Sequence, residues 1–426
     1  HLSSKGTDVS ILGTTVDGID EASDRERFEA FAKKHGLRMP NGATGTSSDD
    51  IRKAVEQIGF PVLIRPSYVL GGRGMEILSN DSQLDAYLKE AYLAPDKPLL
   101  VDEYLGHATE LDVDAAADGK EVLVGAIMEH LEEAGIHSGD STCFIPTQNI
   151  SEEMLRRVED QTRTIGLGLN IKGCFNIQFA IQGDDLYVLE VNPRSSRTVP
   201  FVAKSSGLPL AKIAANVTIG IPLSEQTIPK RTTGQICVKA PVFPFIKLRG
   251  LDPAPGPEMK STGEVYGSDT SADVAYLKAR LATEVPVAIE GGVYLTVRDE
   301  DKHELAPIAK ELYDLGFTLY ATPGTADILR DHGLLVTTVY RINERKHPDA
   351  LDLMRQGDIS FIVNVPTISG GAVRDGNMMR RLAVELNIPF VTTIRGARME
   401  AAAIRALIEK EIIPRKLEVH YDSKFL

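Results

Sequence analysis

The sequence predicts a multidomain chain that combines α/β and α+β architecture. Its 426 residues, 42% of them hydrophobic, are too many for one ordinary core and indicate two or three domains. Between residues 99 and 191, apolar and polar residues alternate in several runs, which predicts an antiparallel sheet. From about residue 285 onward, strand-like and helix-like segments alternate, which predicts a parallel sheet covered by helices on both faces.

The composition of the chain argues against several classes of protein and of binding partner. Charged residues make up 25% of the chain, which argues against disorder, and the net charge of -13 disfavours nucleic acid as a general partner. The three cysteines are Cys143, Cys174 and Cys237; they lie far apart and outside any C-x-x-C pair, so we expect no zinc site or disulfide framework and a reducing, cytoplasmic location. No apolar run approaches the roughly 18 residues of a membrane span, so we expect no membrane partner.

The chain begins with His1 and has no apolar signal-peptide core, and we expect it to be a fragment of a longer protein. Residues 1–40 are expected to be the end of an upstream domain, with a short strand at 9–13 and an amphipathic helix at 24–36. That helix would place Phe28, Phe31 and Ala32 on one face. A loop at 41–45, a helix at 49–58 and a strand at 62–64 follow, and the proline-rich residues 240–257 are typical of a connector.

The final part contains five expected strands separated by helices. The strands are expected at 293–297, 318–321, 335–339, 360–365 and 390–393, with helices such as 304–315 and 378–386 between them.

A hairpin at residues 174–192 carries the strongest chemical signal. With its turn centred on Asp184, paired residue numbers sum to about 368, so Gln178 lies opposite Glu190 and shares a face with Asn192. One carboxylate and two amide oxygens suit a hard cation such as Mg²⁺, although any solvated strand face also carries polar residues. Arg194 and Arg197 follow directly, and cations beside a metal carboxylate indicate neutralisation of a transferring phosphoryl group.

Two further loops are candidates for nucleotide contacts. Residues 65–75 pass from Arg65 into a glycine-rich stretch whose N–H groups could approach a phosphate, but a plain turn explains glycines equally well, and the P-loop pattern is absent. His137 lies in a polar loop flanked by glycines, where binding groups are often displayed, whereas a lone histidine is usually structural.

The exact strings in these loops resemble the large subunit of carbamoyl-phosphate synthase. They are RPSYVLGGR at 65–73, MEH at 128–130, HSGDS at 137–141, EVNPR at 190–194, TVPFV at 198–202 and PEMKSTGEV at 257–265. The likeness covers essentially the whole chain and is greatest to the second half of that subunit, which phosphorylates carbamate. It implies an ATP-grasp domain at 41–225, a connector packed on it at 226–284, and a regulatory domain similar to methylglyoxal synthase at 285–426.

The resemblance also implies roles for individual residues. Arg65 would contact ATP phosphate, and Arg194 and Arg197 would face the phosphoryl and carbamate groups. The remaining nucleotide contacts would come from Glu103, Leu105, Glu110, Gly135, Ile136, His137 and Ser138. Gln178, Glu190 and Asn192 would hold Mg²⁺ or Mn²⁺, and Glu132 is a candidate ligand for K⁺.

In the last domain, the resemblance implies a site for a small phosphorylated effector. Its residues would be Lys302, Thr322, Thr325, Arg341 and Asn364. The turn at 322–325 suits a phosphate because it opens a helix after a strand. The family pattern has hydroxyl residues where this chain has Val365 and Pro366, so a pyrimidine monophosphate is expected to bind weakly, and the effector stays open.

Three functions are therefore compared. The first is formation of carbamoyl phosphate from carbamate and ATP, feeding arginine and pyrimidine synthesis together with a carboxyphosphate-forming half and a glutaminase subunit. The second is another ATP-grasp carboxylate ligase, against which the long matching strings argue. The third is a regulatory fragment that binds nucleotide without turnover.

Overall fold

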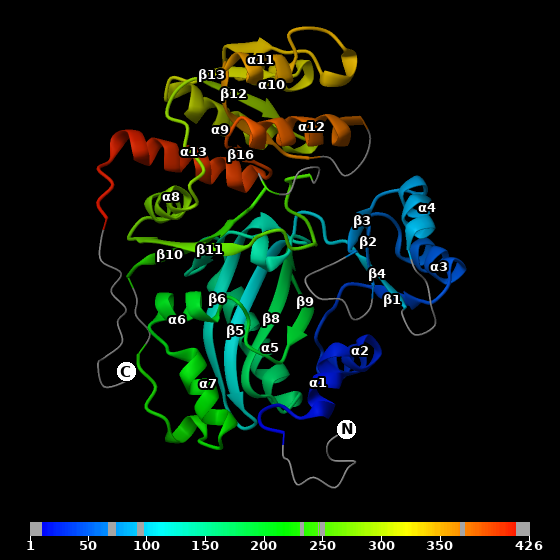
Figure 1. Ribbon diagram of the computed structural model, residues 1–426. Helices are drawn as coiled ribbons and strands as arrows, with labels where there is room; N and C mark the ends of the chain where they lie inside the picture. The colour runs from blue at the N-terminus through cyan, green and yellow to red at the C-terminus, as the bar shows by residue number, and fades with distance from the viewer. Residues whose placement is uncertain are drawn as a thin grey trace.

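The computed structural model describes residues 11–66, 74–91, 98–230, 234–245, 247, 252–366 and 371–414, with residues 371 and 372 described by backbone only. Within these residues, three sheets organise the fold (Figure 1). Two are antiparallel, and the third, at the top of the view, is parallel. Among the described helices, none has both the length and the apolar character needed to cross a membrane.

The small sheet has the order β1-β4-β2-β3. Its strands are β1 (Gly42–Gly45), β2 (Val62–Pro66), β3 (Glu76–Leu78) and β4 (Leu99–Glu103), and it packs on α3 (Ser48–Ile58) and α4 (Asp81–Glu90) through Ile51, Val55 and Leu84. The loop predicted at 41–45 is wrong, because residues 42–45 pair with β4, a partner more than 50 positions away. Two helices precede the sheet, α1 (Val16–Ser23) and α2 (Arg25–Lys34). The second buries Phe28, Phe31 and Ala32, as predicted.

The expected strand at 9–13 does not form over residues 11–13, and residues 9 and 10 lie outside the described part of the chain.

The large sheet has the order β11-β10-β7-β6-β5-β8-β9, which confirms the predicted antiparallel sheet. Its strands are β5 (Thr109–Asp118), β6 (Val122–Glu133), β7 (Cys143–Ile145), β8 (Lys172–Gln182), β9 (Asp185–Asn192), β10 (Ile236–Val242) and β11 (Gly263–Asp269). One face is apolar along its length and packs on α2 and on α5 (Glu152–Gly168). The opposite face is covered near one end by α6 (Val199–Ser206) and α7 (Leu210–Thr218), which pack on Ala116 and Met128. The other end of that face carries the polar residues of the candidate site.

The proline-rich segment is only partly a connector. Residues 240–242 belong to β10, including Pro241, and β10 and β11 extend the large sheet rather than leaving it. Helix α8 (Ala272–Ala282) then packs on these two strands.

The C-terminal sheet is parallel throughout, in the order β14-β13-β12-β15-β16. The strands are β12 (Gly292–Thr296), β13 (Thr318–Ala321), β14 (Val336–Thr338), β15 (Ile359–Asn364) and β16 (Phe390–Val391). Helices α9 (Lys302–Asp314), α10 (Pro323–Asp331) and α13 (Ile394–Glu409) cover one face, and α11 (Ala350–Gln356) and α12 (Gly371–Glu385) cover the other. This arrangement confirms the predicted architecture. Short 3₁₀ turns occur at Ser138–Asp140, Leu223–Glu225, Asp299–Asp301 and Ile342–Glu344.

The C-terminal domain docks on strand β6 of the large sheet. Arg298 Nη2 lies 3.1 Å from Glu133 Oε1, and Arg395 Nη2 lies 2.5 Å from Glu129 Oε1. The two carboxylates are four residues apart on one strand, so both ion pairs fix the same edge of the domain interface.

Candidate functional site

The hairpin that carries the candidate metal ligands has the predicted register at Gln178 and Glu190. Gln178 pairs with Glu190, and Asn176 pairs with Asn192, so paired numbers sum to 368 as predicted. Nearer the turn the pairing differs by one residue, since Ala180 pairs with Tyr187. A bulge on β9 absorbs the difference.

The bulge changes the position of Leu189, which strict alternation places on the apolar core face. Leu189 instead packs against the small cluster of Leu105, Ala108, Ala134 and Ala180. Ala180 lies two residues from Gln178 on the same strand face, so the bulge brings an apolar side chain to the polar site. The result is a hydrophobic patch directly beside the candidate metal residues, suited to the flat face of a base.

The neighbouring strand β5 contributes a row of acids to the same face. Glu110 lies opposite Ala180, Asp112 opposite Gln178 and Asp114 opposite Asn176. Asn176 donates from Nδ2 to Asp112 at 2.9 Å and to Asp114 at 3.0 Å. Sequence reasoning used the alternation at 110–114 to predict a strand and missed Asp112 and Asp114, although that same alternation places them beside Glu110.

Burial and neighbouring groups shift the pKa values of these three acids in different directions. Burial raises the pKa of Glu110 to about 7 against the opposing effect of His130, and burial together with Asp112 raises the pKa of Asp114 to about 6. Burial also opposes ionisation of Asp112, but its contacts with His130 and Asn176 outweigh this and lower its pKa. His130 lies 3.2 Å from Asp112 through Nε2, and it too was missed. The face therefore holds a buried row of three acids with different pKa values and one histidine against it.

The loop after β9 is tied to this row. Ser196 and Thr198 each donate a hydroxyl hydrogen bond of 2.7 Å to the carboxylate of Asp114. Arg197 lies between these two residues, is exposed and contacts Met259.

The first arginine of the loop lies beside the hairpin residues. Arg194 Nη2 donates to Asn192 Oδ1 at 3.1 Å, and Asn192 Nδ2 donates to Glu190 Oε1 at 2.7 Å. Cationic groups and metal-type oxygens are thus adjacent in space as well as in sequence.

The expected base-binding residues surround the hydrophobic patch. Leu105 is buried in it, and Gly135 N–H donates to the buried Glu110 at 3.4 Å. The Tyr104 ring contacts Gly135, leaving no room there for a side chain. Glu103 instead accepts hydrogen bonds from Asn41, at 2.7 Å from Nδ2.

The loop containing Ile136, His137 and Ser138 closes one side of the site. His137 Nδ1 accepts from Gly139 N–H at 3.0 Å, and burial lowers the pKa of His137. The Ser138 carbonyl accepts from Lys239 Nζ at 2.9 Å, and Lys239, only 1% exposed, was not predicted. Nearby, Glu132 accepts from Thr142 N–H at 2.6 Å, and burial raises its pKa.

Arg65 lies at the end of β2 on the small sheet. Its Nε donates to Asp102 at 3.2 Å, and its side chain is 24% exposed. The glycine-rich residues 67–73 that follow it lie outside the described residues.

The candidate effector residues occupy the carboxyl edge of the parallel sheet. Lys302 opens α9, and its Nζ lies against Gly324 in the turn between Thr322 and Thr325. Arg341 follows β14. Asn364 ends β15 and accepts a hydrogen bond from the buried Arg380, a contact that sequence reasoning did not foresee.

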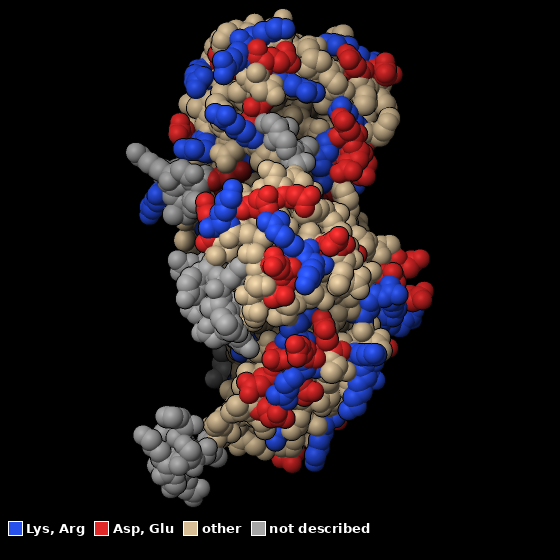
Figure 2. Space-filling view, turned by 90° about the vertical axis from the view of Figure 1, so that its right-hand side faces the viewer, with Lys and Arg blue, Asp and Glu red and all other residues tan. Residues whose placement is uncertain are grey.

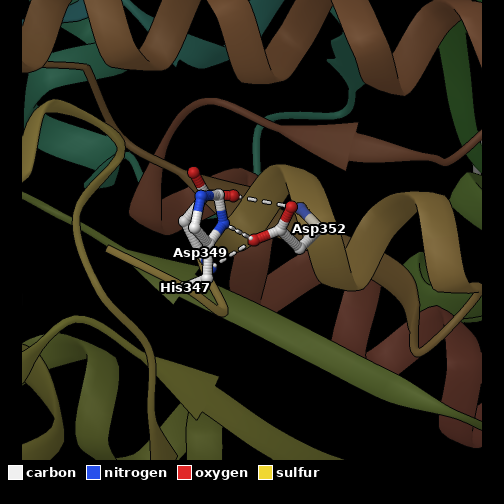
Figure 3. A group of neighbouring side chains, drawn as sticks. All are labelled: His347, Asp349 and Asp352. Carbon is white, nitrogen blue, oxygen red and sulfur yellow. Dashed lines mark hydrogen bonds and ion pairs between the residues drawn. The ribbon is translucent and has the colours of Figure 1, made fainter. Parts of the chain in front are cut away.

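His347, Asp349 and Asp352 form another cluster whose ligand-type atoms lie within 4.8 Å of one another (Figure 3). Asp349 and Asp352 each accept the other's backbone N–H at 3.0 Å, which makes them a capping box at the start of α11. His347 lies 2.5 Å from Asp352. Their geometry is explained by helix capping.

Figure 2 shows the side of the molecule that lies on the right in Figure 1, and acidic and basic side chains are interspersed over this face.

Comparison with known proteins identifies the families that two parts of the chain match. Residues 24–226 match the family described as "Carbamoyl-phosphate synthase L chain, ATP binding domain", and residues 304–392 match the "MGS-like domain". The carbamoyl phosphate synthase large chain of Methanosarcina acetivorans is 47% identical over 406 residues, which are 95% of this chain and 38% of that protein. The "Carbamoyl phosphate synthase large chain, C-terminal section" of Methanocaldococcus jannaschii is 44% identical over 421 residues, covering 96% of this chain and 68% of that protein.

Solved structures agree on the fold. A carboxyaminoimidazole ribonucleotide synthase from Aspergillus clavatus, complexed with ATP, has a TM-score of 0.55 at 17% identity, over 66% of this chain and 77% of that one. The biotin carboxylase domain of a Hydrogenobacter thermophilus carboxylase, complexed with MgADP, has a TM-score of 0.52 at 16% identity, over 65% and 69% of the two chains. These likenesses confirm the expected ATP-grasp fold.

Proposed function

The chain belongs to the carbamoyl phosphate synthase large chain family, and from this premise we propose that it transfers the γ-phosphoryl group of ATP to carbamate, giving carbamoyl phosphate and ADP. It spans 38% of one intact large chain and 68% of a separately encoded C-terminal section. The observation that carries the proposal is the contact of Arg194, in the loop after β9, with Asn192, which lies with Glu190 on one sheet face, next to a hydrophobic patch that suits a base.

The site suggests an orientation for the nucleotide. The base would lie on the patch around Leu105 and Leu189, and the ribose near Glu110. The phosphates would then extend toward the hairpin and Arg194, with Arg65 approaching from the small sheet. An arginine fork matches phosphate oxygens in two places, so these side chains would position the chain of phosphates as well as neutralise it.

The donor set suits a divalent cation. Gln178, Glu190 and Asn192 offer one carboxylate and two amides, the hard oxygen ligands that Mg²⁺ and Mn²⁺ accept. Such an ion supplies charge neutralisation to the phosphates when it is bound. Glu132, which is buried near the loop that carries His137 and Ser138, remains a candidate for binding K⁺.

The chain's own residues would do the rest by positioning. A carbamate oxygen attacks the γ-phosphorus, the bond to the β-phosphate oxygen breaks, and ADP leaves, with no proton transferred. Arg194 and Arg197 would hold the carboxylate of carbamate and the transferring oxygens, and the Asp114 contacts would keep their loop in place. No covalent protein nucleophile is required.

The reverse reaction tests the proposal. Purified chain supplied with ADP, Mg²⁺ and carbamoyl phosphate should produce ATP, and Glu190→Gln should abolish this while the melting temperature stays near that of the wild type. Asp184→Asn, in the turn of the same hairpin, is the matched control and should retain activity. ATP binding without ATP synthesis would favour a nucleotide-binding regulatory fragment, and turnover only with another carboxylate would favour another ATP-grasp ligase.

We further propose that residues 41–225 form the ATP-grasp domain, 226–284 the connector and 285–426 the allosteric domain, with 1–40 as a remnant of an upstream domain. A small phosphorylated effector would bind Lys302, Thr322 and Thr325, with Arg341 and Asn364 at the same sheet edge. The partners would be a carboxyphosphate-forming half and a glutaminase subunit, and the location cytoplasmic.

A further inference from the structure

The connector residues 252–261 contact the loop at 135–141, here called the nucleotide loop, at one end and the C-terminal domain at the other. On the nucleotide side, Asp140 accepts hydrogen bonds from the backbone N–H groups of Lys260 at 2.8 Å and Ser261 at 2.9 Å. Ser261 Oγ donates to the Gly139 carbonyl at 2.9 Å, and His137 N–H donates to the Gly256 carbonyl at 2.8 Å. Four hydrogen bonds therefore join this segment to the loop that carries His137 and Ser138.

At the other end, the segment is held by an arginine from the C-terminal domain. Arg380 of α12 is 2% exposed, and its Nε and Nη2 donate to the two oxygens of Asp252 at 2.9 and 2.5 Å. Its Nη1 donates to Asn364. Gly376 makes room for it, since a Cβ there would lie 2.8 Å from Nη1.

Lys260 connects the two ends. Its ammonium group donates to the backbone carbonyls of Asp252 at 3.1 Å and Ala254 at 2.6 Å, while its N–H is bound to Asp140. Residues 252 and 260 are thereby clasped together, so a displacement of Asp252 is passed to the residues that hold the nucleotide loop. A two-point ion pair with a buried arginine resists partial opening, because breaking it leaves the buried guanidinium without full compensation.

We propose that Arg380 is a positioning residue for the nucleotide loop, acting through Asp252, Lys260 and Asp140. Asn364, a candidate effector residue, shares Arg380 with Asp252. A phosphorylated ligand bound at the sheet edge would compete for that guanidinium and alter its hold on the connector. The inference rests on the proposed function for its kinetic readout, but not for its binding readout.

The test compares two arginines that both join the domains. Arg380→Gln should raise the KM for ADP in the reverse reaction by about tenfold, within the range shown by coupling residues, and change kcat by less than about twofold. Arg395→Gln removes the ion pair to Glu129, which does not involve residues 252–261, and should leave the KM unchanged. Lys260→Met should reproduce the Arg380→Gln effect, and the double variant should add little to either, since both act in one chain of contacts.

Equal increases of the KM in Arg380→Gln and Arg395→Gln would overturn the proposal and favour simple domain docking. An unchanged KM in Arg380→Gln would also overturn it. If Arg380→Gln does not fold, Gly376→Ala displaces the same guanidinium without removing its charge and should also raise the KM. ADP dissociation constants from calorimetry distinguish failure of the proposed function from failure of the positioning role of Arg380. A wild-type chain that binds ADP without turnover contradicts the proposed function. A higher ADP dissociation constant in Arg380→Gln but not in Arg395→Gln still supports the positioning role.

Discussion

Asp114 offers the most quantitative test of the site. The replacement Asp114→Asn is nearly isosteric, and the surrounding hydrogen bonds can be completed with it. Asn176 and Ser196 would still donate to Oδ1, and the new amide would donate to Thr198, whose hydroxyl can turn toward Ser196 at 2.8 Å. The variant therefore removes a buried charge without opening a cavity.

The magnitude follows from the pKa. Burial and the Asp112 carboxylate raise the pKa of Asp114 from 3.8 to about 6. The folded chain thus holds this proton more tightly than the unfolded chain, so the stabilisation is complete below pH 3.8 and is lost as the pH rises through 6. From this group alone, the free energy of unfolding of the ligand-free wild type should fall by about 1.4 kcal/mol between pH 5 and pH 8.

Urea unfolding of wild type and variant, measured together at pH 5 and pH 8, isolates the effect because the titrations of groups that do not interact with Asp114 cancel. We expect the variant to gain about 1.4 kcal/mol on the wild type over this interval, while its phosphoryl transfer declines because the arginine loop loses its anionic anchor. Asp118→Asn is the control from the same strand. Hydrogen bonds from backbone N–H groups outweigh partial burial and lower the pKa of Asp118, so its contribution is lost as the pH falls, the opposite direction. Parallel pH profiles for wild type and Asp114→Asn would contradict the raised pKa of Asp114.

Three further outcomes are expected. Arg65→Ala should weaken ATP binding by about tenfold or more in calorimetry, the value of one hydrogen bond to a charged group, whereas Arg52→Ala, which breaks an exposed ion pair on the same lobe, should not. The purified chain should release no glutamate from glutamine, because its three cysteines are buried and lie in no amidotransferase motif; glutamate formation would contradict this. Thr325→Ala should abolish the thermal shift produced by whichever phosphate ester stabilises the wild type, and a screen without any Thr325-dependent shift would leave the C-terminal domain without its regulatory role.

Short-range patterns explain why so much was predictable. Alternation places Glu190 and Asn192 on one face of their strand, because the side-chain period of a strand is two. The hairpin pairing then adds Gln178 to the same face. The pairing of Gln178 with Glu190 was also correct, although for an incomplete reason. The turn is one residue tighter than predicted, and the bulge at Leu189 restores the register before the candidate metal ligands.

Tertiary structure decided the features that depend on distant partners. Residues 42–45 are a strand only because β4 lies beside them, and Pro241 lies in a strand because β10 extends the large sheet.

By itself, the sequence determined the fold class, the helix and strand periods and the residue types of the site, because these follow from local spacing. It could not determine the pKa values of Glu110 and Asp114, which depend on their burial in the folded chain, or the contact of Arg380 with Asp252, which joins residues 128 positions apart. Charge and hydrogen bonding across such separations exist only after the domains have packed, because the low dielectric surroundings that make them strong are created by that packing.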